Sequence, residues 1–149
     1  MNHAEVSSFA EAARAFCELV EADAPATAAG RLSDARRLLA RLYAAACDLE
    51  PGPDGVDLDP PPRARLKTWS GLEPVEYYYE NFDPLEPTEV GAGSLTDDFL
   101  DIHLDLKRGL SLFDAGHEAA AVWEWRTSFD EHWGRHAVSA LRALHRACR

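Results

Sequence analysis

Four aspartates share one predicted helix, and their spacing stacks most of them along a single face. They are Asp97, Asp98, Asp101 and Asp105. Like charges four residues apart destabilise a helix by about 0.2–0.5 kcal/mol per pair. The positive end of the helix dipole can offset this repulsion for the first two aspartates, but not for the two that lie further along. Asp101 and Asp105 therefore need partners from another element.

The expected partners lie on the next predicted helix. They are Arg126, His132 and His136. A short turn near Gly116 would fold this helix back antiparallel to the first. Counting residues away from the turn places Asp105 beside Arg126, Asp101 near residues 126–130, and Asp97 and Asp98 near residues 132–135. The sequence thus predicts a polar cluster between the last two long helices.

Three interpretations of this cluster stay open. It is either a structural network that fixes the register of two helices, a metal site, or a pocket for a small ligand or a partner peptide. Two imidazoles four residues apart can face one ion, with a carboxylate as third ligand. The chain has no H-E-x-x-H sequence and lacks the paired Glu-x-x-His motifs of di-iron bundles. The sequence alone therefore assigns no metal and no cofactor.

A second group of candidate residues is aromatic. It comprises Tyr77, Tyr78, Tyr79 and Phe82. Four rings within six residues form a large apolar plate. Such a plate either packs against the helices as part of the core or forms an exposed binding surface.

Other catalytic chemistries find little support. The chain has no G-x-S-x-G, no phosphate-binding G-x-x-x-x-G-K and no G-x-G-x-x-G. The three cysteines lie far apart and form no C-x-x-C, which argues against a disulfide framework or a zinc knuckle. The sequence therefore favours a protein that is not an enzyme without deciding the question, and we assign no catalytic residue.

The charge distribution is strongly uneven. The net charge is −11, and residues 68–106 hold ten acidic residues with no Lys or Arg. We do not expect nucleic acid as a partner, because phosphate binding needs clustered basic residues. An anionic membrane surface is disfavoured for the same reason. This acidity either keeps the protein soluble and pairs internally with Arg31, Arg36, Arg37 and Arg41, or forms a docking face for a basic protein partner.

Apolar residues at spacings of three and four predict helices over residues 4–22, 31–49 and 94–116, and from 117 to the end. Residues 50–62 read as a Pro-rich acidic linker. Residues 63–90 read as one or two short helical pieces, one around residues 66–72 and one from Pro74 through Tyr77–Phe82. No useful strand alternation is evident. The prediction is one all-α domain over residues 1–149, a bundle of four long helices plus one or two short ones.

The last predicted helix is long for a bundle of this size. It would extend roughly 50 Å at about 1.5 Å per residue, against a radius of gyration of about 15 Å. It should therefore break, with Gly134 as the weak point, overhang, or pack against a second copy in a homodimer. The chain shows neither a membrane-spanning stretch nor a secretory signal, so we expect a cytoplasmic protein.

Three blocks of the sequence resemble a bacterial family of proteins, the domain of unknown function numbered 5063. The blocks are residues 78–84, residues 94–109 and residues 123–137. Position 103 holds His where the resemblance leads us to expect Tyr. The resemblance implies a small helical bacterial domain and transfers no catalytic residue.

Two functions remain as hypotheses. The first is a non-enzymatic interaction or accessory module of the bacterial cytoplasm, based on the missing catalytic motifs and the acidic face. The second is a metal- or small-ligand-dependent enzyme that uses the cluster between the last two helices. Its residues would be Asp98, Asp101, His132 and His136.

Overall fold

Two antiparallel helices begin the fold, α1 (His3–Glu21) and α2 (Ala28–Cys47). Our computed structural model describes residues 2–22, 28–50, 52, 59, 61 and 72–149. At the start of α1, Asn2 Oδ1 accepts the backbone N–H of Glu5 at 3.0 Å, and the Glu5 carboxylate accepts the N–H of Asn2 at 2.9 Å. This reciprocal capping box satisfies two backbone donors that would otherwise lack a partner in the helix.

A β-hairpin stands where the aromatic run was expected to be helical. Strand β1 (Tyr77–Glu80) pairs antiparallel with β2 (Gly91–Ser94), and Tyr78 lies opposite Gly93. Tyrosine favours strands, and a Cβ on Gly93 would lie only 2.3 Å from the Tyr78 ring. The prediction of a helix through Tyr77–Phe82 was therefore wrong. The other predicted helical piece, and most of the 50–62 linker, lie outside the described residues.

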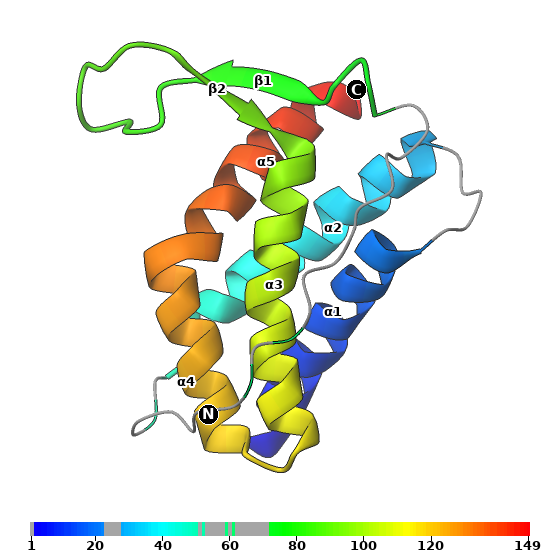
Figure 1. The fold of residues 1–149 in the computed structure, drawn as a ribbon, viewed down its shortest axis with the longest axis vertical. Coiled ribbons are helices and arrows are strands. Elements are labelled where there is room, and N and C mark those ends of the chain that lie inside the picture. The colour runs from blue at the N-terminus through cyan, green and yellow to red at the C-terminus, as the bar shows by residue number, and fades with distance from the viewer. Residues whose placement is uncertain (1, 23–27, 51, 53–58, 60, 62–71) are drawn as a thin grey trace.

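Helix α3 (Leu95–Asp114) runs through the middle of the molecule and contacts α1 on one side and the last helices on the other. Ser94 caps this helix, since its Oγ accepts the N–H of Asp97 at 3.2 Å. Gly116 ends the helix with a positive φ of 84°, a conformation that glycine adopts without strain. Figure 1 shows the hairpin above the end of the bundle where α3 begins and α5 ends.

The C-terminal helical segment changes its hydrogen bonding where a break was expected. It consists of α4 (Glu118–Ser128), a π-helical turn η1 (Phe129–Trp133) and α5 (Gly134–Ala147). The N–H of Gly134 donates to the carbonyl of Phe129, and a Cβ on Gly134 would lie 2.4 Å from that oxygen. Helix α4 packs on α3, and α5 packs on α2 and α3. The segment therefore does not overhang the bundle. The length of the last helix no longer favours a homodimer, which stays a prediction.

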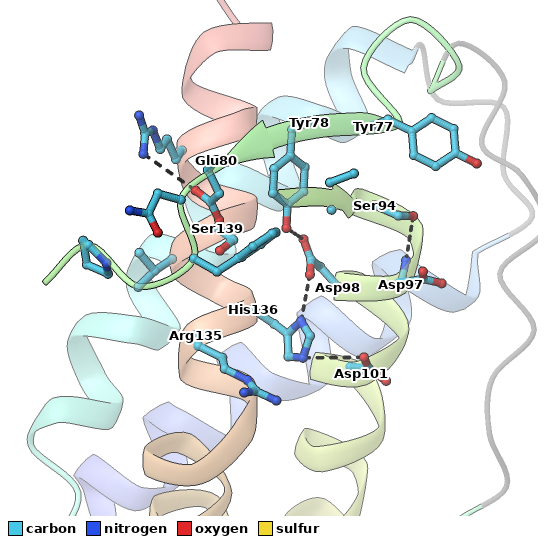
Figure 2. Close-up of a pocket in the computed structure, with 17 residues that line it drawn as sticks. Tyr77, Tyr78, Glu80, Ser94, Asp97, Asp98, Asp101, Arg135, His136 and Ser139 are labelled. Carbon is cyan, nitrogen blue, oxygen red and sulfur yellow. Dashed lines mark hydrogen bonds and ion pairs between the residues drawn. The ribbon is translucent and has the colours of Figure 1, made fainter. Parts of the chain in front are cut away.

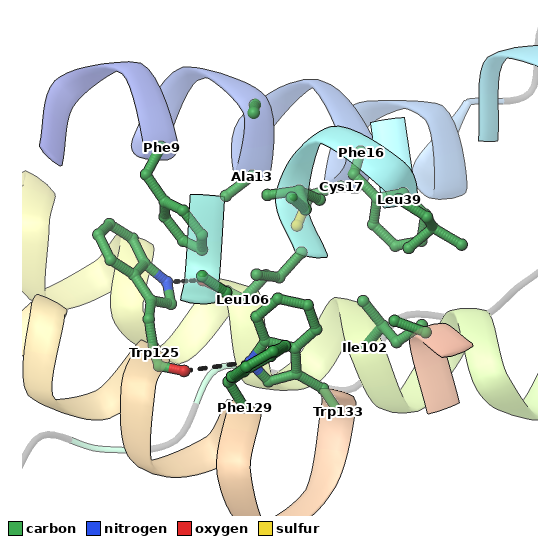
Figure 3. Packing of buried hydrophobic residues seen from close by; sticks show 14 of the residues in the cluster. Phe9, Ala13, Phe16, Cys17, Leu39, Ile102, Leu106, Trp125, Phe129 and Trp133 are labelled. Carbon is green, nitrogen blue, oxygen red and sulfur yellow. Dashed lines mark hydrogen bonds between the residues drawn. The ribbon is translucent and has the colours of Figure 1, made fainter. Parts of the chain in front are cut away.

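The core lies between α1, α2, α3 and the last helices and is rich in aromatic rings (Figure 3). Trp125 and Trp133 are fully buried, and each indole N–H has a carbonyl partner, Leu106 O at 3.1 Å and Trp125 O at 3.2 Å. Buried indoles need such acceptors. The all-α prediction is confirmed, with the two-stranded hairpin as the addition. Among the described residues, no helix has the length and apolar character needed to cross a bilayer.

Candidate functional site

The hairpin and the start of α3 are tied together by one carboxylate. Glu76 accepts hydrogen bonds from Ser94 Oγ at 2.6 Å and from Thr96 Oγ1 at 2.7 Å. The same segment contributes its backbone, since the N–H of Leu95 donates to the carbonyl of Glu76 at 2.9 Å. These bonds fix the first turn of α3, and with it the direction in which the following aspartates point.

Five of the predicted residues come together between α3 and the last helices. We call Asp98, Asp101, Asp105, His132 and His136 the Asp–His cluster. His132 Nδ1 lies 2.6 Å from Asp105 Oδ2, and His136 Nδ1 lies 2.8 Å from Asp98 Oδ1. His136 Nε2 lies 3.6 Å from Asp101 Oδ2. The two pairs and the third aspartate form one continuous polar seam.

The helical geometry explains how these side chains meet. Asp98 and Asp105 are two turns apart on the face of α3 that packs against α5, and both are buried. His132 belongs to the π-turn, and His136 follows it in α5. Their rings lie 4.8 Å apart at 75°. π-turns inside α-helices occur frequently at functional sites, and this one carries half of the imidazole pair.

The environment shifts the pKa values of several of these groups. The hydrogen bond to Asp98 raises the pKa of His136 above its usual value, and burial opposes this only in part. Burial raises the pKa of the Asp105 carboxyl, although His132 acts in the opposite direction. Burial and the neighbouring Asp98 carboxylate raise the pKa of the Tyr78 hydroxyl. The seam thus favours a protonated His136 and keeps Tyr78 a hydrogen-bond donor.

Arg126 does not belong to the cluster, contrary to the sequence-based prediction. Its Nη1 donates to the carbonyls of Ala46, Cys47 and Leu49 at 3.0–3.3 Å, and its Nε pairs with Asp130 at 2.8 Å. The preceding residue explains this direction. Because the indole of Trp125 fills the side of α4 that faces α3, Arg126 points toward the end of α2 instead.

Replacement of Arg126 by Met is accordingly expected to cost about 1–2 kcal/mol of unfolding free energy, since it removes a cation from the carbonyl end of α2 and leaves no buried acid. Urea unfolding measures this loss. Arg37→Met is the matched control, because that side chain is 73% exposed and pairs only with the half-exposed Asp34 one turn away among the described residues, a pair expected to contribute little. A loss of 3 kcal/mol or more in Arg126→Met would contradict this assignment.

The remaining predicted site residues are divided between two surfaces. Asp97 is exposed in the first turn of α3, and no hydrogen bond or ion pair of its side chain is found among the described residues. The aromatic set is split by strand alternation. Tyr77, Tyr79 and Phe82 are exposed, whereas Tyr78 points inward and donates its hydroxyl proton to Asp98 Oδ2 at 2.6 Å.

A cleft of about 840 Å³ opens between the hairpin and the helices. Tyr78 lines one wall, and Asp98, Asp101 and His136 lie at its inner side, as Figure 2 shows. Ser139 hydrogen-bonds Tyr78 from α5. Sequence reasoning missed Ser139 and the neighbouring Glu80, because their places in the cleft depend on how the hairpin docks.

His103, the residue that departs from the family resemblance, lies apart from this cleft. It is buried, and its Nε2 lies 2.7 Å from Glu21 Oε1, which Lys107 also contacts at 2.8 Å. Its Nδ1 is buried, and no hydrogen-bond partner for it is found in the described part of the chain. Burial lowers the pKa of His103 below its usual value. We therefore assign it to the link between α1 and α3 and not to the candidate site.

Asp101, His132 and His136 are the residues best placed to hold a metal ion. Each offers one ligand atom, and these three atoms lie within 4.8 Å of one another. Among the described residues, no other group of three or more His, Cys, Asp and Glu side chains meets this condition. Chemically, the arrangement can bind a cation through mixed nitrogen and oxygen ligands.

Comparison with known proteins gives a fold but no activity. No curated protein matches this sequence. The crystal structure of protein BF1032 from Bacteroides fragilis has a TM-score of 0.77 with 21% sequence identity. The similarity covers 99% of this chain and 94% of that one. At this identity the likeness shows a shared fold only.

The family comparison covers almost the whole chain. Residues 1–148 match the family described as a domain of unknown function, DUF5063. This extent includes the three blocks that carried the resemblance as well as the N-terminal helices. The chain therefore belongs to the DUF5063 family.

Proposed function

We propose that this protein is a non-enzymatic interaction module of the bacterial cytoplasm, and that its hairpin binds a positively charged segment of a partner protein. The surface concerned, the hairpin face, has five exposed apolar side chains and three acidic ones. They are Tyr77, Tyr79, Phe82, Leu85 and Val90, with Asp83, Glu86 and Glu89. A bacterial origin is supported by the resemblance and by the source of the similar structure.

The observation that carries this proposal is the concentration of exposed apolar side chains. Six large apolar residues are exposed in the described part of the chain, and five of them lie on the hairpin face. Tyr79 is 72% exposed and Leu85 is 90% exposed. A concentration of exposed apolar side chains in one segment, interspersed with polar ones, favours a protein–protein contact site.

Charge complementarity decides the kind of partner. The exposed carboxylates of this face come from a stretch, residues 68–106, that holds no Lys or Arg. Tyrosine and phenylalanine rings attract Lys and Arg side chains through their faces, by about 0.5–1 kcal/mol at exposed sites. A segment that alternates basic and apolar residues would satisfy both features of the surface.

A fluorescein-labelled peptide of alternating lysine and leucine tests this proposal by fluorescence anisotropy. We expect saturable binding that weakens as salt is added, and no binding of the matching glutamate–leucine peptide. The double variant Tyr77→Ser/Tyr79→Ser is expected to bind the basic peptide at least tenfold more weakly.

A matched pair of charge variants controls for net charge. Glu86→Gln/Glu89→Gln removes two acids from the hairpin face, whereas Glu11→Gln/Glu18→Gln removes two exposed acids from α1. Only the first pair is expected to weaken peptide binding. Equal effects of both pairs, or equal binding of the acidic peptide, would refute a docking role for this face.

A further inference from the structure

The Asp–His cluster is built in the way that proteins build metal sites. One ligand atom from each of Asp101, His132 and His136 lies within 4.8 Å of the other two. We infer that these three residues bind a single divalent transition-metal ion of the zinc type. This site lies beyond the docking role proposed for the hairpin face and does not depend on it.

The distances are close to those that coordination requires. Zinc bonds of about 2.0–2.2 Å place the ligand atoms of a tetrahedral site roughly 3.3–3.5 Å apart. His136 Nε2 and Asp101 Oδ2 are already 3.6 Å apart. To reach coordination distances, the His132 ligand atom must move closer to those of Asp101 and His136. The side chain of His132 is 38% exposed and so has room for this movement.

The orientation of both imidazoles supports a metal site most directly. Each imidazole has its Nδ1 held by a buried carboxylate, His132 by Asp105 and His136 by Asp98. With the proton of the neutral ring on Nδ1, the lone pair is on Nε2, the nitrogen left for a metal. Metal-binding histidines usually donate their other N–H to a carboxylate in this manner, which fixes the ring and raises its basicity.

The hairpin also helps to hold His136, through Tyr78 and Asp98. Asp98 also accepts the hydroxyl proton of Tyr78, which Ser139 contacts in turn. The two oxygens of Asp98 are therefore both engaged, one by Tyr78 and one by His136. An aspartate held at both oxygens keeps His136 in one orientation.

The charge balance of the cluster favours a dication. Three aspartates face two imidazoles, and the guanidinium of Arg108 lies 3.6 Å from Asp105. Arg135 also lies close enough to His136 to affect its charge, and the exposed Asp97 lies nearby on α3. A divalent ion that displaces the extra proton of His136 would offset most of the negative charge of the three aspartates.

The ligand types determine which metal fits. Imidazole nitrogen suits zinc, copper, nickel and ferrous iron, whereas magnesium and calcium prefer oxygen ligands throughout. Three protein ligands leave a fourth position open, as in zinc sites that bind an exogenous ligand. Because Asp101 and His136 line the cleft, that open position would face it.

Metal titration of protein that carries no affinity tag and has been stripped with EDTA tests this inference. We expect one equivalent of Zn²⁺ to bind, with weak or no competition from Mg²⁺ and Ca²⁺. Co²⁺ is expected to develop the intense visible absorption of a low-coordinate site. His132→Gln and Asp101→Asn should each weaken Zn²⁺ binding at least 100-fold.

Two further variants distinguish the loss of a residue that holds a ligand from the loss of an unrelated surface histidine. Asp98→Asn leaves all three ligands in place and is expected to weaken Zn²⁺ binding by about 10–100-fold. His145→Gln removes an exposed histidine of α5 outside the cluster and should change nothing. Peptide binding at the hairpin face should be the same in His132→Gln and wild type, so the two proposals fail or stand separately.

Several results would overturn the inference. One is equal Zn²⁺ affinity in His132→Gln and His145→Gln, and another is Mg²⁺ binding as tight as Zn²⁺ binding. Should a variant fail to fold, the wild-type Co²⁺ spectrum still decides, because a spectrum identical to that of hydrated Co²⁺ excludes coordination by the cluster.

Discussion

Replacement of His136 by Leu is expected to lower the unfolding free energy of the metal-free protein by about 3–5 kcal/mol, because it leaves a buried acid without its cationic partner. The side chain of Asp98 is only 6% exposed, and Tyr78 would be its remaining hydrogen-bond donor among the described residues. Urea unfolding at neutral pH measures the loss. His145→Leu, at an exposed site on the same helix, is the matched control and should cost under ~0.5 kcal/mol.

A double variant shows whether the unpaired carboxylate causes the loss. Asp98→Leu/His136→Leu removes both charges and replaces them with apolar volume, and such exchanges of buried pairs are often close to neutral. Tyr78 keeps Ser139 as a partner in this background. We therefore expect the double variant to be more stable than His136→Leu alone. A double variant as unstable as the single one would show that packing, not charge, is lost.

The same pair predicts a pH dependence with a definite sign. The hydrogen bond to Asp98 raises the pKa of His136 above its usual 6.5. A group whose pKa is raised on folding stabilises the fold below its unfolded pKa, and this stabilisation is lost as pH rises through the folded pKa. The cost of His136→Leu should therefore be larger at pH 6 than at pH 9, and unfolding of both proteins across this range tests it.

The helices and the polar seam could be predicted because both depend on periodicity. Aspartates at positions 98 and 105 and histidines at 132 and 136 repeat with the helical turn, so antiparallel helices must bring the two sets to the same interface. The predicted pairing of individual residues along that interface was only approximate. Asp105 meets His132 instead of Arg126, because the rotation of α4 is set by how Trp125 packs, which residue counting does not include.

The hairpin could not be predicted because its signal is too short. Strand β1 has four residues, and its partner Gly91–Ser94 consists of residue types with little preference for strands. Its stability depends on contacts made after folding, such as Tyr78 with Asp98 and Ser94 with Glu76. The same contacts turn Tyr78 inward while Tyr77 and Tyr79 stay exposed, so the aromatic run is part cleft and part surface.

Removal of the Trp125 side chain is expected to have the other large effect on stability. Trp125→Ala should cost about 3–5 kcal/mol, as is usual for a buried aromatic residue replaced by alanine. The ring contacts Phe9 and Phe113, with centroid distances of 4.8 and 6.1 Å, and its N–H bonds to Leu106. Trp123→Ala, at a half-buried neighbouring position, should cost less in the same urea unfolding experiment.

Gly109→Ala should change stability in opposite directions with and without the Trp125 indole. A Cβ at this position would lie 2.0 Å from Trp125 Nε1, so Gly109→Ala in the wild type should destabilise the fold by about 1–3 kcal/mol. In the Trp125→Ala background that obstacle is gone, and alanine is favoured over glycine in a helix by about 1 kcal/mol. Gly109→Ala should then stabilise the protein, or at least cost nothing. An equal loss in both backgrounds would mean that the indole does not lie against α3 at Gly109, and the explanation for the direction of Arg126 would fail with it.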